Sequence, residues 1–295
     1  MEYISGVATL ALINIVAVCG VIILTGFTGL FSLGHAGLVA IGAYAAGILA
    51  KYYHVHFILA ILLGGLFSAA ASIIVGYPTL RGKLKGDYFA IAMLGFAEGI
   101  RLLLANIYPL VGGATGLIGI PRKTNFTVAA VFAIVFIFFT VNYTRSQHGK
   151  LALAIREQEI AADLVGVNVT REKMKSLLIS AYFAGVAGGL YSMYYGFITP
   201  NTFAATMSND LLAAVVFGGM GSVTGPVIAG ALLTALPEVL RAFSRWRLVL
   251  YGLAMVVIML VKPEGLMGNK ELSLYPLIRK IKNRRQTVNP QKGEE

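Results

Sequence analysis

Long apolar blocks, separated by short polar or glycine-rich connections, dominate the chain. Five blocks are long enough, as helices, to cross a bilayer: 3–25, 57–77, 88–104, 126–143 and 176–198. The block 26–50 contains six glycines, which let helices pack closely in lipid or mark a helix broken near the membrane surface. Two further blocks, 211–236 and 246–261, complete a pattern that predicts an all-α, polytopic membrane bundle.

The block 211–236 is interrupted by the sequence GGMGSVTGP. Its turn-forming residues predict two short helices that meet at a break: Gly218, Gly219, Gly221 and Pro226. A similar glycine-rich run, FSLGHAGLVAIGA, precedes an apolar helix near residue 31. The two runs are consistent with a duplicated bundle, a common arrangement in transporters, and equally with two independent origins.

Residues 150–175 form the only long polar interval between apolar blocks. Apolar residues recur there at helical spacing from Leu151 to Val165, and Gly166 is the expected helix stop. Such a helix can lie on lipid or dock into a groove of a soluble partner. Its polar face carries three acids against one arginine, which favours a protein groove over anionic lipid: Arg156, Glu157, Glu159 and Asp163.

Composition supports a membrane protein. Of the 295 residues, 57% are hydrophobic and 13% are charged, and the mean hydropathy is +0.78. Soluble domains contain about 25% charged residues, so a multispanning protein is the better interpretation. The single cysteine excludes an internal disulfide. The net charge of +11 fits basic cytoplasmic loops better than a nucleic-acid partner.

The distribution of cations predicts the topology. The segments 79–87, 144–175 and 262–295 hold 17 of the 24 lysines and arginines, and we expect all three on the cytoplasmic side. The N-terminus is then external, with nine crossings, two of them short, or eight in an alternative count. We expect a transmembrane domain over 1–268, with a cytoplasmic loop at about 145–175, and a basic cytoplasmic tail over 269–295.

Catalytic and metal-binding patterns are absent from the sequence. It contains no GxxxxGK[ST], GxSxG or HExxH motif, and its four histidines have no metal-ligand partner at a useful spacing. We therefore predict no catalytic residue, no metal and no cofactor bound by this chain, and a function in moving a solute.

Polar groups inside the apolar blocks are candidate functional groups, because they are costly in hydrocarbon. Glu98 and Arg101 are three residues apart on one helix face, so they either line a translocation path or form a structural ion pair. His35 is either a pore residue or a hydrogen-bonding partner of a neighbouring helix. For Asn14 and Ser32 we expect interhelical hydrogen bonds, with Ser32 also a candidate path residue.

Several of these runs together resemble the LivM-type permeases of branched-chain amino acid ABC importers. The resemblance extends in order from about residue 12 to residue 268. It rests on GFTGLFSLGHAGLVAIGAYAAGIL, GDYFAIAMLGFAEGIRLLLAN, GGATGLIGIP, GKLALAIREQEIAADLVGVNVTREKMK, FGGMGSVTGPVIAGALLTALPEVLR and YGLAMVVIMLVKPEGLMG. Several long blocks in the right order are more specific than any one glycine-rich motif.

The resemblance implies the ABC importer permease fold and a set of partners. These are a LivH-like permease, LivG- and LivF-like ATPases that hydrolyse the ATP, and a periplasmic or lipid-anchored amino-acid-binding protein, in the cytoplasmic or inner membrane of a bacterium or archaeon. The segment EIAADLVG resembles the E-A-A-x3-G coupling loop of ABC importers, with Ile160 in place of an alanine. The resemblance assigns the ATPase contact to Glu159, Ala161, Ala162 and Gly166, and the implied solutes are leucine, isoleucine and valine.

Alternative functions remain at the level of the sequence. Urea or short-amide ABC permeases have closely similar signatures. An ion-coupled carrier could use Glu98, Arg101 and His35 as a relay. A purely structural membrane scaffold is the third alternative.

Overall fold

A computed structural model describes residues 2–82, 86–239 and 265–268, together with residues 252, 256 and 260. Apart from those single residues, the predicted span 246–261 lies outside the described part of the chain, as does the tail 269–295. The expectations for both segments stay predictions.

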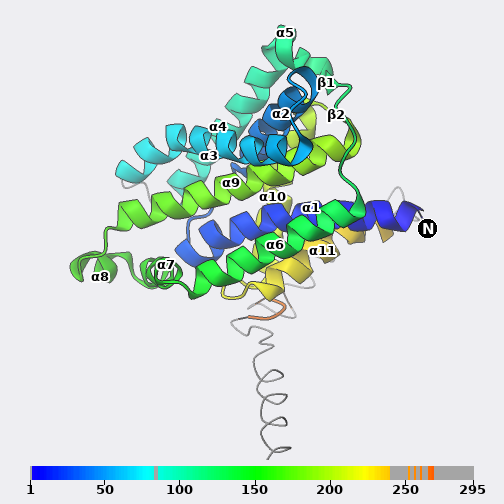
Figure 1. Ribbon diagram of the computed structural model, residues 1–295. Coiled ribbons are helices and arrows are strands. Elements are labelled where there is room, and N and C mark those ends of the chain that lie inside the picture. Colours follow the sequence, from blue (N-terminus) through cyan, green and yellow to red (C-terminus); the bar gives the residue numbers. More distant parts are fainter. Residues whose placement is uncertain are drawn as a thin grey trace, which may run out of the picture.

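The described chain is almost entirely helical, as Figure 1 shows, which confirms the all-α class. Its α-helices are α1 (Glu2–Val21), α2 (His35–Tyr52), α3 (Phe57–Arg81), α4 (Asp87–Asn106), α5 (Tyr108–Val111), α6 (Phe126–Arg145), α7 (Gln147–Glu157), α8 (Glu159–Leu164), α9 (Val169–Tyr195), α10 (Ala205–Gly218) and α11 (Thr224–Val239). A π-helix, η1 (Ile22–Phe27), continues α1, and two short 3-10 turns follow later, η2 (Gly113–Thr115) and η3 (Pro200–Phe203).

Five described helices are long and apolar enough to cross a membrane: α1 with η1, α3, α4, α6 and α9. They correspond to the five apolar blocks of the sequence that were predicted to cross a bilayer. Helix α11 is apolar but shorter. Several helices that can cross a bilayer make this a multi-pass membrane protein.

Close helix packing around α9 forms the core. Helix α9 packs against α1, α2 and α3, with α2 and α3 on one side of it in Figure 1 and α1 on the other. Glycines make this possible: a Cβ built at Gly42 of α2 would lie 2.2 Å from the Gly185 carbonyl oxygen of α9. A Cβ at Gly188 would lie 2.0 Å from the Val39 carbonyl oxygen. Small residues let helix backbones approach in this way, which compensates for the weak hydrophobic force between helices in lipid.

The chain leaves its first helix at residues 28–34 before α2 begins, which is the first helix break. Side chains satisfy backbone groups there, since no water can do so deep in a bundle. The Thr25 hydroxyl donates to the Leu30 carbonyl at 3.0 Å. At the start of α2, the Ala36 amide donates to the Ser208 hydroxyl of α10 at 2.8 Å.

Helix α3 runs through Pro78 to Arg81, whereas the sequence predicted a span over 57–77, which ends directly before Pro78. Proline removes one backbone donor, and helices in membranes tolerate this when side chains bond to the freed carbonyls. Next to it, the Thr79 hydroxyl donates to the Val75 carbonyl at 2.7 Å, which adds a bond beside the Ile74 carbonyl that Pro78 leaves without its helical donor. The prediction therefore placed the helix end one turn too early.

The two ends of the bundle differ. At one end, a two-residue antiparallel pair joins β1 (Leu117–Ile118) to β2 (Phe197–Ile198), with Leu117 opposite Ile198. Figure 1 shows α7 and α8 at the opposite end of the bundle.

Candidate functional site

Helices α7 and α8 form the one long polar segment between spans, and the chain breaks between them at Gln158. The Gln158 backbone is extended, with φ −156° and ψ 99°. The prediction of one amphipathic helix over 151–165 is therefore wrong, because the break turns α8 back towards the start of α9. Gly166 follows α8 with a φ of +87°, the left-handed conformation that glycine adopts readily after a helix.

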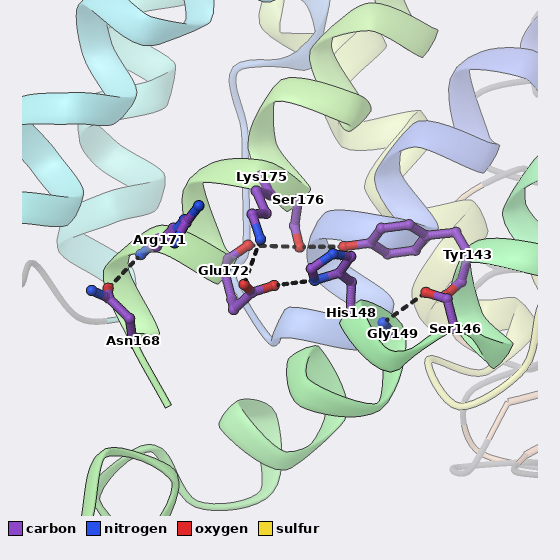
Figure 2. Close-up of polar contacts among 9 residues, drawn as sticks. All are labelled: Tyr143, Ser146, His148, Gly149, Asn168, Arg171, Glu172, Lys175 and Ser176. Atoms are coloured by element: carbon purple, nitrogen blue, oxygen red, sulfur yellow. Dashed lines mark hydrogen bonds and ion pairs between the residues drawn. The ribbon is translucent and has the colours of Figure 1, made fainter. Parts of the chain in front are cut away.

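Local caps fix where the flanking helices begin, as Figure 2 shows. At the start of α7, the Gly149 amide donates to the Ser146 hydroxyl at 3.4 Å. At the start of α9, the Arg171 amide donates to the Asn168 side-chain oxygen at 3.0 Å. Serine and asparagine are favoured at this position because they satisfy amides that have no partner inside the helix. The ends of the α7–α8 segment are thus set by the local sequence.

Glu172 is the polar centre of the contact between α7 and α9 (Figure 2). Its carboxylate lies 2.9 Å from His148 Nδ1 and accepts from Lys175 Nζ at 2.8 Å. Glu172 is only 7% exposed, and a buried carboxylate is stable only with such partners. One turn along α9, the hydroxyls of Tyr143 and Ser176 lie 2.9 Å apart and join the end of α6 to the same helix.

A second ion pair holds α8 itself. Lys173 Nζ lies 2.8 Å from the Glu159 carboxylate, and Lys173 is buried whereas Glu159 is about one-third exposed. The sequence resemblance assigned Glu159 to the contact with an ATPase. In this structure its carboxylate pairs with Lys173 and orients α8 on α9, and its contact with an ATPase stays a prediction.

The outer face of α8 is apolar and open. Leu164 is 83% exposed and Val165 is 80% exposed, and Ile160 and Ala161 are exposed beside them. Ala162 points the other way and is buried, so its small side chain serves the packing of α8 on the bundle. Apolar side chains of this size gathered at an exposed helix end are typical of an interaction surface.

A cavity of about 410 Å³ adjoins this helix. Its lining comes from the end of α3, from α8 and from the start of α9, and includes Leu80, Glu159, Ile160, Asp163, Gly166 and Lys173. The cavity and the exposed face together give α8 both a projecting apolar surface and a partly polar recess.

The predicted site residues Arg156 and Glu157 lie at the end of α7 and point in different directions. Glu157 is exposed. Arg156 is half-buried, and its Nη1 donates to the Gly26 carbonyl at 2.6 Å and to the Met220 carbonyl at 3.1 Å. It therefore contacts the bundle and not the open face of the segment.

The predicted second helix break lies between α10 and α11. Gly218 ends α10, Gly219 has a φ of +104°, and Gly221 lies in the turn that follows. Pro226 is the third residue of α11, where its missing amide costs no hydrogen bond. The segment 265–268 returns to this point, and the Leu266 amide donates to the Phe217 carbonyl at 2.7 Å.

Ser32 and His35 are buried where α2 begins. His35 Nε2 lies 2.8 Å from the Ser180 hydroxyl of α9, so this histidine does hydrogen-bond to a neighbouring helix. Ser32 makes a local contact, in which its hydroxyl accepts from the Gly34 amide at 3.4 Å, and not the expected interhelical bond. Both side chains are fully enclosed by the bundle in this conformation.

Glu98 and Arg101 pair on α4, as their spacing predicted. Arg101 Nε lies 2.7 Å from the Glu98 carboxylate, and Arg101 Nη1 donates to the Asn201 side chain at 3.0 Å. Both charges are partly exposed in the isolated chain. Elsewhere, Asn14 donates to the Thr234 hydroxyl at 3.0 Å, which confirms the interhelical bond between α1 and α11.

The sequence did not predict which residues contact Glu159, His35, the start of α2 or Arg156. Ser180, Ser208 and Met220 lie 145, 172 and 64 residues along the chain from the residue they contact, and Lys173 lies in the next helix after Glu159. Small hydroxyl residues inside apolar helices were the one available signal, and it applied to Ser180 and Ser208 alone. For Lys173 and Met220 the local sequence contained no signal of a distant partner.

Comparison with known proteins gives a consistent result. The family model described as the permease component of the branched-chain amino acid transport system matches residues 3–259. The chain is 35% identical to the high-affinity branched-chain amino acid permease LivM of Salmonella typhimurium, over 88% of this chain and 69% of the relative, and equally to LivM of Escherichia coli. It is 25% identical to the LivH permease of Salmonella typhimurium, over 90% of this chain and 93% of the relative. No solved structure matches the chain.

Proposed function

Because the chain belongs to the family of permease components of branched-chain amino acid ABC transport systems, we propose that it forms half of a membrane pathway for leucine, isoleucine and valine. A second, LivH-like permease forms the other half. LivG- and LivF-like ATPases supply the energy, and a periplasmic or lipid-anchored binding protein delivers the solute. ATP is hydrolysed by the partner subunits, since this sequence contains no phosphate-binding loop.

The single observation that carries this proposal is the exposed apolar face of α8, held on a rigid base. Leu164 and Val165 project from a short helix that is tied to α9 through Glu159 and Lys173. Helices that insert into a groove of a partner need apolar anchors and a fixed orientation. An ATPase that grips this face can move α8, and α8 is linked to the helices of the bundle.

The distribution of charge supports a cytoplasmic position for this end. Six lysines and arginines lie within 144–175, and basic residues collect in cytoplasmic loops. The end of α3 shares this side, since Leu80 lines the cavity beside α8. We propose eight or nine crossings with an external N-terminus and a cytoplasmic C-terminus, in the inner or cytoplasmic membrane of a bacterium or archaeon.

The mechanism we propose is alternating access. Closure of the ATPases on ATP pushes α8 and tilts the permease halves between outward-open and inward-open states. The binding protein selects the solute, so the path itself binds weakly and releases quickly. Glu98 and Arg101 neutralise one another on α4 and so leave little net charge to trap a zwitterion.

Replacing Leu164 by glutamate tests the docking role of α8. We expect association with the ATPases to weaken at least tenfold, or about 1.4 kcal/mol, because a carboxylate then enters an apolar contact. The measurement is co-purification of the ATPases with the tagged permease. Gln147→Glu is the matched control, because it adds the same charge at an exposed position of α7. Full retention of the ATPases by Leu164→Glu would refute the docking role.

A further inference from the structure

Arg156 connects three segments that are far apart in the sequence. It lies in the last turn of α7, and its Nη1 donates to the carbonyl of Gly26 at 2.6 Å and to that of Met220 at 3.1 Å. Gly26 lies at the end of the helix before the first break, and Met220 lies in the second break, between α10 and α11. One guanidinium thus contacts both interruptions of the helical bundle.

The chemistry of this contact is well served by a guanidinium. The last carbonyls of a helix and the carbonyls of a turn have no partner inside the helix, so they are free to accept. Bonds from a charged donor are shorter and about twice as strong as neutral ones. Nη1 alone carries two N–H donors, so it can serve both carbonyls at once, and the guanidinium does not lose its charge.

Glycines make room for the arginine and bring the breaks together. Gly29 has a φ of +71°, and a Cβ built there would lie 3.1 Å from Arg156 Cγ. A Cβ built at Gly26 would lie 3.1 Å from the Met220 carbonyl oxygen. The two breaks therefore touch each other beneath the arginine, and any larger residue at Gly26 or Gly29 would press on this contact.

The segments beyond the two breaks lead into different parts of the bundle. The first break leads into α2, which packs on α3 and α9, and the second leads into α11, which packs on α1 and α10. Helix α7, which carries Arg156 in its last turn, is joined to α8 by a single extended residue, Gln158. Ile155, next to Arg156, is buried in the bundle. A displacement of α8 therefore reaches α2 and α11 through the same side chain.

We propose that Arg156 is a positioning residue that makes the two helix breaks move together when α8 is displaced. This inference rests on the proposed function, in which the ATPases grip α8. It assigns Arg156 to the inner side of the coupling machinery, where it transmits motion and does not contact the ATPase.

The test uses the complete importer, with both permeases, both ATPases and the binding protein, reconstituted in proteoliposomes. Arg156→Met removes both bonds and keeps an unbranched apolar stem. We expect it to retain its ATPases and to lower leucine uptake per ATP hydrolysed about tenfold, which corresponds to about 1.4 kcal/mol. Arg156→Lys, which provides a charged donor without the planar guanidinium, should recover part of this ratio.

Arg122→Met is the matched control. It also removes an arginine that donates to a main-chain carbonyl, that of Tyr195 at 3.0 Å, at the last residue of α9, whereas α7 and α8 precede the first. Its uptake per ATP should equal that of the unsubstituted importer. If Arg156→Met does not reach the membrane, Arg156→Gln, which keeps a donor without the charge, is measured in its place.

Two results would overturn the inference. An unchanged uptake per ATP in an assembled Arg156→Met complex would show that the breaks do not depend on this contact. Loss of the ATPases from that complex would show that Arg156 serves docking. Failure of the proposed function itself is recognised separately, because Leu164→Glu would then leave the ATPases bound.

Discussion

We predict that removing Glu159 destabilises the attachment of α8 to α9 more than removing its ion-pair partner Lys173. Lys173 is buried and Glu159 is about one-third exposed, so the two partners leave different groups behind when either is removed. Glu159→Ala leaves the buried ammonium of Lys173 without this carboxylate acceptor. Lys173→Met removes the buried charge, keeps the apolar stem and leaves a carboxylate that reaches water. Removing one partner of a buried pair is costly, whereas replacing a buried charge by a well-packed apolar group is often close to neutral.

The expected free-energy cost follows from the hydrogen bond between Lys173 and Glu159. A hydrogen bond to a charged group contributes about 1.5–3 kcal/mol, and about 1.4 kcal/mol corresponds to a factor of ten. Detachment of α8 from α9 is a local opening, so it is measured by hydrogen exchange of the Ala162 and Val165 amides, which donate within this segment. Exchange should accelerate roughly 10- to 150-fold in Glu159→Ala and less than about fivefold in Lys173→Met.

The double variant Glu159→Ala/Lys173→Met separates the loss of the ion pair from a second effect of replacing Glu159. Glu159 also lies in the first turn of α8, where a negative charge is favourable, and this effect is lost whenever Glu159 is replaced. Comparing Glu159→Ala in the parent and in the Lys173→Met background cancels that loss. We expect little acceleration in the second background. Equal acceleration in both backgrounds, with the α6 amides unchanged, would refute the asymmetry and with it the role of the pair in holding α8.

Two further predictions concern the bundle. Gly188→Ala places a Cβ 2.0 Å from the Val39 carbonyl oxygen and should destabilise the complex by about 1–3 kcal/mol. No described atom lies within 4 Å of a Cβ at Gly95, so Gly95→Ala should stabilise α4 by up to about 1 kcal/mol. Melting temperatures of the purified complex should therefore shift in opposite directions, and shifts of the same sign would contradict the packing argument. Asn14→Ala should cost only about 0.6 kcal/mol, the average for an interhelical bond such as that to Thr234, and a loss of uptake at normal stability would instead place Asn14 on the solute path.

Much of the fold could be predicted from the sequence, because membrane helices obey a length rule. Apolar blocks of about 20 residues gave the five long helices, and the i,i+3 spacing of Glu98 and Arg101 gave their ion pair. Both features depend on residues close together in the chain, where geometry is fixed by the helix itself.

The errors arose at two places where the local pattern did not decide the structure. The pattern over 151–165 fits one helix, but the chain breaks at Gln158, and Glu159 directly after the break pairs with Lys173 of α9. Pro78 suggested a helix end, but α3 continues past it. Periodicity and proline positions describe local preference, and tertiary contacts override such preferences.

Glycine shows why the site could be recognised only in part. The same residue type serves three purposes in this chain: Gly188 allows two helices to touch, Gly29 turns the backbone beneath Arg156, and Gly95 faces open space. The sequence around each is apolar and similar, so density of glycine predicts close packing or a break without distinguishing them. The difference lies in what stands across from the residue, which is a backbone carbonyl in the first case and the stem of an arginine in the second. A glycine therefore identifies a place where another segment can approach, and the partner across from it, where there is one, decides whether that place holds the bundle together or transmits its movement.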